Sequence, residues 1–181
     1  MTDVALVVVD MQHVFADPAS PWSTPDFGRA AAGVRRLLPV FAGATVWTRF
    51  VAPERPTGAW RAYYDEWPFA LVADADPIWT IDPALGPGTD PVVSAPTFGK
   101  WGDGLATAVG DAGRLVVVGV STDCCVLSTA LAAADAGRAV VVAADACAGA
   151  TTADHDRALA TMALYAPLIT ITTVDEVVAG R

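Results

Sequence analysis

The sequence predicts an α/β fold in which helices cover both faces of one parallel β-sheet, a three-layer, doubly wound, Rossmann-like architecture. Short apolar runs rich in β-branched residues alternate with segments of helical spacing along the whole chain, as in sheets built from β-α-β units. In addition, 54% of the residues are apolar and only 17% are charged. Such a composition suits strands that are buried on both faces, and the length of 181 residues suits a single domain spanning 1–181.

Six strands are predicted at apolar runs that are too short to cross a membrane. In chain order they are Val4–Val9, Thr45–Phe50, Pro91–Ser94, Leu115–Val120, Ala139–Ala144 and Leu168–Thr172. Helices are predicted between them where apolar residues recur every three or four positions, and two of these helices end at a glycine. They are Phe27–Phe41, a helix that includes Leu105–Val109, Cys125–Ala136 and Ala153–Tyr165.

Residues 51–90 have little periodicity and are rich in proline, glycine and aromatic residues. A loop of this length inside a compact domain is usually functional or covers another surface. One interpretation is a cover on the sheet or a subunit interface, and the other is that some of the aromatic residues wall a pocket. The six tryptophans and an acidic surface predict a homodimer or higher homo-oligomer.

The charge and the cysteines limit the partners and the compartment. A net charge of −9 and a pI near 4.4 argue against nucleic acid and anionic membranes, because both require a positive surface. Three cysteines, two of them adjacent, form no disulfide framework. No secretory signal is visible at the N-terminus. The expected location is therefore the cytoplasm, and the expected partner is a small-molecule substrate.

Two reactive side chains follow predicted strands. Asp10 comes directly after Val4–Val9, and Cys125 lies in the turn after Leu115–Val120. Ligands of doubly wound sheets bind at the carboxyl ends of the strands where the strand order reverses, so these side chains converge if the two strands are neighbours there. A thiol at a helix N-terminus is favoured as thiolate, and nearby N–H groups can hold an oxyanion. This pattern predicts a cysteine nucleophile with a lowered pKa.

Plainer interpretations exist for the same residues. Asp10 is also typical of a turn or helix cap, and a cysteine in an apolar helix is usually a small buried hydrophobic residue, which we expect for Cys124 and Cys147. His13 and His155 are the only histidines and lie far apart in sequence, so no metal site is predicted. For His155, near the start of the last long helix, we expect an exposed or capping position.

Three segments together resemble the isochorismatase-like cysteine hydrolases. They are Val7-Val8-Val9-Asp10-Met11-Gln12, Gly119-Val120-Ser121-Thr122-Asp123-Cys124-Cys125-Val126 and Asp145-Ala146-Cys147. The resemblance runs from about Val4 to Val178 and implies a six-stranded sheet of order 3-2-1-4-5-6. It also implies a catalytic triad of aspartate, lysine and cysteine, which places Asp10 and Cys125 in two of the roles. Cys125 is preferred to Cys124 because the family's cysteine directly precedes a valine.

Lys100 is the only lysine of the chain, and Gln12 is its only glutamine. The family's lysine stands at the end of the third strand, whereas Lys100 follows that strand by a few residues. Lys100 therefore either completes the triad from an unusual position or is a surface residue of a site that works without a lysine.

The resemblance implies a hydrolase that cleaves the C–N bond of a small carboxamide or related amide through a thioester. Backbone N–H groups of Ser121 and Cys125 would stabilise the oxyanion, and the Val120–Ser121 peptide bond would be cis. We expect Phe15, Phe50, Trp60 and Trp101 to wall the pocket. The histidines that bind metal in nicotinamidases are missing after the second strand, so no cofactor is expected and nicotinamide is disfavoured as substrate.

Three alternatives remain open at this point. The chain can be an isochorismatase-type hydrolase of another small metabolite, although the isochorismatases proper lack the nucleophilic cysteine. It can also be a binding protein that keeps the fold without turnover. A thiol redox protein that uses Cys124 and Cys125 is the third alternative, disfavoured because vicinal disulfides are strained and the motif Cys-x-x-Cys is absent.

Overall fold

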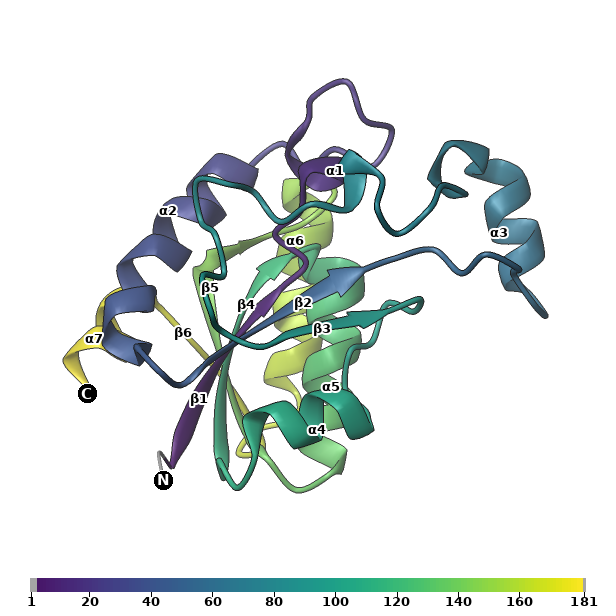
Figure 1. Cartoon of the computed structure of the whole chain (residues 1–181). Coiled ribbons are helices and arrows are strands. Elements are labelled where there is room, and N and C mark those ends of the chain that lie inside the picture. The colour runs from purple at the N-terminus through teal and green to yellow at the C-terminus, as the bar shows by residue number, and fades with distance from the viewer. Residues whose placement is uncertain (1–2, 181) are drawn as a thin grey trace.

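The computed structural model describes residues 3–180 and contains a six-stranded parallel sheet (Figure 1). Its strands are β1 (Val4–Val9), β2 (Thr45–Phe50), β3 (Val92–Ala95), β4 (Arg114–Val120), β5 (Ala139–Ala148) and β6 (Ile169–Thr172). The order β3-β2-β1-β4-β5-β6 confirms the predicted α/β sheet. Because the order reverses between β1 and β4, residues that follow these two strands meet at the carboxyl edge of the sheet.

Helices cover both faces of the sheet, α2 and α7 on one face and α4, α5 and α6 on the other (Figure 1). The helices are α1 (His13–Ala16), α2 (Phe27–Leu37), α3 (Trp60–Glu66), α4 (Asp103–Val109), α5 (Leu127–Asp135), α6 (Thr152–Ala163) and α7 (Val174–Ala179). Short 3₁₀ turns lie at Leu38–Phe41, Pro68–Ala70 and Pro77–Trp79. Among the described residues no helix has the length and apolar character needed to cross a bilayer.

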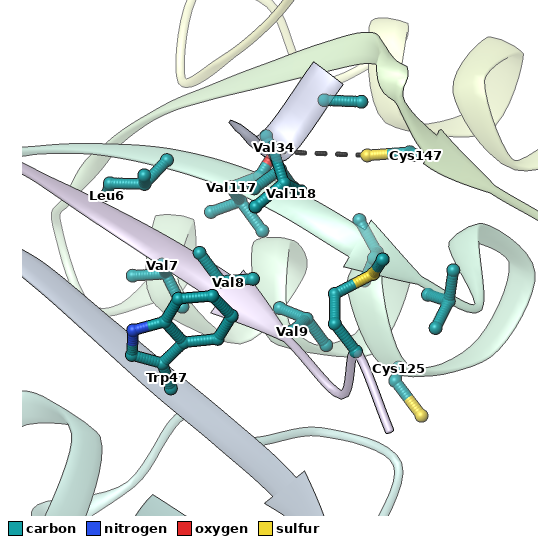
Figure 2. Packing of buried hydrophobic residues seen from close by; sticks show 14 of the residues in the cluster. Leu6, Val7, Val8, Val9, Val34, Trp47, Val117, Val118, Cys125 and Cys147 are labelled. Carbon is teal, nitrogen blue, oxygen red and sulfur yellow. Dashed lines mark hydrogen bonds between the residues drawn. The ribbon is translucent and has the colours of Figure 1, made fainter. Parts of the chain in front are cut away.

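The centre of the core is formed by β1 and β4, with side chains that exclude water on both faces of the sheet (Figure 2). Leu6 to Val9 are fully buried, as are Val117 and Val118 on the neighbouring strand. Gly119 pairs with Val9 and has a φ of 114°. A Cβ at Gly119 would lie 2.1 Å from the Val9 carbonyl oxygen, so only glycine lets β4 lie this close to β1 directly before Asp10.

Some predicted boundaries differ from the structure. The strand β5 continues to Ala148 because a register shift between Val117 and Gly119 lets the two strands pair again beyond it. The helix predicted from Cys125 begins earlier, as η4, a π-helical turn at Thr122–Val126 that leads into α5. The helix α7 was not predicted, although Thr173 and Glu176 form a capping box at its start.

The aromatic residues of the 51–90 segment pack within the chain. Trp79 is fully buried, and the ring of Trp60 contacts those of Tyr63, Tyr64 and Phe98. In Figure 1, α3 stands beyond the end of β2, away from the body of the sheet. The tryptophans therefore give no independent reason for a subunit interface, and the homo-oligomer stays a prediction.

Candidate active site

Asp10 is the first residue after β1 and is completely buried. Its φ of 48° turns the chain sharply, a conformation that aspartate tolerates better than most residues. The hydroxyl of Thr48, in β2, donates to Asp10 Oδ1 at 2.6 Å and accepts from the Asp10 N–H at 3.2 Å. Thr48 therefore fixes both the backbone and the carboxylate of Asp10.

Lys100 lies beside Asp10, with no side-chain exposure on either residue. Its Nζ is 2.9 Å from Asp10 Oδ2 and donates to the carbonyl oxygens of Thr97 and Phe98. The ammonium also lies 4.9 Å from the centre of the Phe50 ring. The loop after β3 thus folds back so that the ammonium has two carbonyl acceptors and an ion-pair partner in Asp10. The alternative that Lys100 is a surface residue is wrong, because its side chain is buried beside Asp10.

Cys125 lies in η4 with only 3% of its surface exposed, close to the end of β1 (Figure 2). The charges of Asp10 and Lys100 both act on its thiol. Burial, followed by the Asp10 charge, raises the pKa of Cys125 well above its ordinary value, and Lys100 opposes this shift. The expected lowering of the Cys125 pKa is therefore wrong for the unliganded protein, where desolvation outweighs the cation.

The other two cysteines occupy different surroundings. Cys124 is half-buried, and its thiol faces the Asp123 carboxylate at 3.6 Å. The prediction that Cys124 turns into the interior is wrong, because the π-helical turn directs both adjacent cysteines toward one cavity. Burial raises the pKa of Cys124 to about 12. Cys147 is a core residue of β5, as expected, with its thiol 4.0 Å from the Val117 carbonyl oxygen (Figure 2).

The turn that carries Cys125 is fixed by backbone hydrogen bonds to Ser121, the residue directly before η4. The Val120–Ser121 peptide bond is cis, as the resemblance implied. The Ser121 carbonyl accepts hydrogen bonds from the N–H groups of Cys124 and Val126 at 3.2 and 3.0 Å. Both Ser121 and Cys125 border the same cavity, so a bound ligand would lie next to this turn.

That cavity has a volume of about 350 Å³, and Cys125 lies in its wall. Its wall includes six aromatic side chains, which are Phe15, Trp22, Phe50, Tyr63, Trp67 and Phe98. Phe15 and Phe50 thus line the cavity, whereas Trp60 and Trp101 do not. Trp60 packs behind Phe50 and Phe98, and the Trp101 ring lies 5.7 Å from the Arg138 guanidinium. The expectation that Trp60 and Trp101 wall the pocket is therefore wrong.

His155 packs against η4, the turn that carries Cys125. It lies in the first turn of α6, and its Nδ1 is 2.8 Å from the hydroxyl of the fully buried Thr122, in η4. Burial lowers the pKa of His155 below its ordinary value, which favours the neutral ring. The expected exposed or capping position is wrong, because α6 packs directly on η4 and buries the ring.

Replacement of His155 by alanine is expected to destabilise the protein by about 1–3 kcal/mol, since the Thr122 hydroxyl loses its buried partner. His155→Asn is the matched control, because an amide can keep the hydrogen bond. Wild-type stability should also fall as the pH drops below about 6.5, because the unfolded chain then binds a proton that the folded chain resists. Urea unfolding from pH 5 to pH 8 measures both effects. Equal losses in the two variants would contradict the role given to the hydrogen bond.

Gln12 ties the carboxyl end of β1 to its neighbours and is fully buried. Its amide donates to the carbonyls of Phe50 and Trp79 at 2.9 and 2.8 Å, and its oxygen accepts from the Phe50 N–H at 2.7 Å. The only glutamine of the chain therefore joins β1, β2 and the 51–90 segment that forms part of the cavity wall.

Replacement of Gln12 by leucine should cost about 3 kcal/mol in the free energy of unfolding, because buried backbone groups of Phe50 and Trp79 lose their partners. Gln12→Glu offers a second measurement. Its carboxylate would repel the two carbonyl oxygens at pH 7, whereas a protonated carboxyl can donate to one of them. We therefore expect the deficit of Gln12→Glu, measured by urea unfolding, to shrink toward pH 5. A Gln12→Leu variant as stable as wild type would refute this role.

Sequence reasoning missed several residues that support the site. Thr48 is one of three polar residues in β2, with Thr45 and Arg49, so the sequence does not single it out, and Thr122 lay in the motif without a role. Asp123 also lines the cavity, and the hydroxyl of Thr129, in α5, accepts from the Lys100 N–H at 2.9 Å. Nothing local in the sequence marks these contacts, because they join segments that are far apart in the chain.

Comparison with known proteins agrees with this geometry. The family model described as Isochorismatase domain matches residues 4–175. The chain belongs to the isochorismatase family. This assignment confirms the resemblance read from the motifs, and the family is one of hydrolases. No curated protein matches the chain.

Several solved structures share the fold of this isochorismatase-family chain. A cysteine hydrolase from Pseudomonas syringae pv. phaseolicola 1448A has a TM-score of 0.87 at 24% identity, covering 98% of this chain and 91% of that one. An isochorismatase-like hydrolase from Alkaliphilus metalliredigens has a TM-score of 0.79 at 19% identity, covering 99% and 98%. N-carbamoylsarcosine amidase from Thermoplasma acidophilum has a TM-score of 0.74 at 18% identity, covering 97% and 98%.

Proposed function

We propose that this hydrolase cleaves the C–N bond of a small carboxamide or related amide through a thioester on Cys125. The observation that carries the proposal is the buried cluster of Asp10, Lys100 and Cys125 against a cavity of about 350 Å³. A nucleophile beside a base that is itself held in place is the arrangement that covalent catalysis requires. The similar fold of a cysteine hydrolase and of an amidase supports the same reaction class.

The first half-reaction begins with a neutral thiol, because burial and the Asp10 charge raise the pKa of Cys125. Asp10 takes the thiol proton as the sulfur attacks the amide carbon, and the carbonyl π electrons move to oxygen. The N–H groups of Ser121 and Cys125 stabilise that oxyanion. When the intermediate collapses, the C–N bond breaks and Asp10 protonates the leaving nitrogen. Ammonia or an amine departs, and the acyl group stays on sulfur.

The second half-reaction returns the enzyme to its starting state. Asp10 takes a proton from water, whose oxygen attacks the thioester carbonyl. The C–S bond then breaks, the carboxylic acid leaves, and the thiolate regains the proton from Asp10. Lys100 is paired with Asp10, and its role is to keep the carboxylate oriented and balanced in charge as the proton comes and goes. No step in this sequence requires a cofactor.

The test is ammonia release from a panel of small amides at pH 7, followed by mass spectrometry of the enzyme mixed rapidly with its best substrate. We expect turnover of at least one amide and an acyl adduct on the peptide that contains Cys125. Hydrolysis of a substrate without any adduct would favour another isochorismatase-type reaction. Saturable binding of amides without ammonia release or an adduct would favour the non-catalytic binding protein.

We propose that the hydrolysis does not depend on a metal ion. Within residues 3–180 no three His, Cys, Asp or Glu side chains are grouped so that they can hold a metal ion. Prolonged chelation should therefore leave amide hydrolysis unchanged, and stoichiometric zinc or iron in the purified protein would contradict this.

We also propose that the protein is a homo-oligomer. Sedimentation at micromolar concentration measures its mass, and a monomeric mass would contradict this proposal.

A further inference from the structure

The cavity beside Cys125 has an unusual balance of charge. Among residues 3–180, its wall contains six aromatic rings and one charged side chain, Asp123, but no lysine, arginine or histidine. Lys100 is the cation of the catalytic cluster, but its side chain is fully buried and paired with Asp10. A substrate in this cavity therefore meets a carboxylate and aromatic faces, with no positive side chain to bind an anionic group.

Asp123 is held with one oxygen occupied and the other nearly free. Its Oδ1 accepts from the Ser121 hydroxyl and from the Ala150 N–H at 2.9 Å. Its Oδ2 receives only the Cys124 thiol at 3.6 Å, a weak donor that leaves acceptor capacity unused. The carboxylate is thus rigid, lies two residues before the nucleophile, and has an oxygen available to a bound ligand.

The aromatic side chains form one connected group around Trp22. The Trp22 ring lies 6.2 Å from Phe15, 5.9 Å from Tyr63 and 6.2 Å from Trp67, centre to centre. Aromatic faces carry negative potential and attract cations, most strongly for tryptophan and for methylated ammonium groups. A carboxylate beside such rings adds to that attraction and repels an anion, since the apolar wall screens little of the charge.

We propose that the substrate carries a positive charge, an ammonium or methylated ammonium group, at the end away from the scissile amide. This inference rests on the proposed amide hydrolysis, and it specifies the substrate class of the same site. Asp123 and the Trp22 group bind the cationic end, while Cys125 and Asp10 act on the amide. Amides with a carboxylate at that end are rejected.

The test uses three amides of matched length. They are trimethylammonium butanamide, its neutral isostere with carbon in place of nitrogen, and the anion glutaramate. We expect kcat/KM for the cation to exceed that for the neutral amide by about tenfold, and that for the anion by about 100-fold or more. Asp123→Asn keeps the shape and one acceptor oxygen, and should lower the cation-to-neutral ratio several-fold but not to one, because the aromatic faces still attract the cation. Asp111→Asn, an exposed carboxylate at the opposite end of the sheet, should leave that ratio unchanged.

A binding measurement separates this inference from the proposed function. Quenching of tryptophan fluorescence in Cys125→Ala reports the affinity for each amide without turnover. If the neutral amide is hydrolysed but glutaramate reacts as fast as the cation, charge selection is overturned and amide hydrolysis stands. If no amide is hydrolysed but the cation binds about tenfold tighter than the neutral isostere, amide hydrolysis fails and the cationic site stands. Equal affinities without turnover overturn both.

Discussion

Replacement of Cys125 by alanine is expected to abolish amide hydrolysis, with a loss of at least about 10⁴-fold in kcat. The variant keeps Asp10, Lys100 and the cavity but lacks the Cys125 thiol, on which the Asp10 charge acts. Steady-state ammonia release measures the loss. Because the cysteine is buried and its replacement is smaller, near-native stability in urea would show that the loss is chemical and not a failure to fold.

Cys124→Ala is the matched control, one residue away in the same turn. It removes a half-buried thiol that faces Asp123 and not Asp10, so most of the turnover should remain. Both cysteines have a raised pKa, so neither should react quickly with iodoacetamide at pH 6 in the unliganded protein. Wild-type turnover by Cys125→Ala, or an acyl adduct on Cys124, would refute the mechanism.

The central strands and their reactive neighbours were predictable because their signals are local. The continuous apolar run of β1 is typical of a strand buried on both faces, and Asp10 directly follows it. The segment from Gly119 to Val126 contains the end of β4, the two adjacent cysteines and Gly119, which lets β4 pack closely against β1. Such features depend on neighbouring residues, and the structure places them where the sequence predicts.

Electrostatics and side-chain direction were less predictable. A helix N-terminus alone favours a thiolate at Cys125, but burial and the adjacent carboxylate outweigh it, and neither is visible in sequence. A regular α-helix would have turned Cys124 about 100° away from Cys125, whereas the π-helical turn brings both to the cavity. These properties arise only once distant segments pack together.

The pocket walls were the least predictable feature. Trp60 and Tyr63 lie in the same helix, α3, but only Tyr63 lines the cavity. Trp22 comes from the separate segment before α2 and joins Tyr63 and Trp67 through ring contacts. The choice among these rings is set by how the 51–90 segment folds over β2, which the aperiodic sequence does not specify.

Replacement of Lys100 by methionine is expected to lower the free energy of unfolding by about 3–5 kcal/mol, because it leaves the Asp10 carboxylate buried without its cation. The side chains of both residues are fully buried, and Nζ lies 2.9 Å from Oδ2. Urea unfolding at pH 7, followed by tryptophan fluorescence, measures the loss. The same variant should lose amide hydrolysis, since Asp10 loses the cation that orients its carboxylate and balances its charge.

A double variant separates the charge from the packing. Asp10→Asn combined with Lys100→Met leaves no buried charge, so its stability should recover most of what Lys100→Met alone loses, while turnover stays absent. Arg157→Met is the matched surface control. Arg157 forms an ion pair with Asp154 at the surface of α6, and such pairs contribute little to stability. If the double variant is no more stable than Lys100→Met, the loss reflects packing around the long side chain. In that case the buried ion pair does not hold Asp10 in place, and the role given to Lys100 in catalysis falls with it.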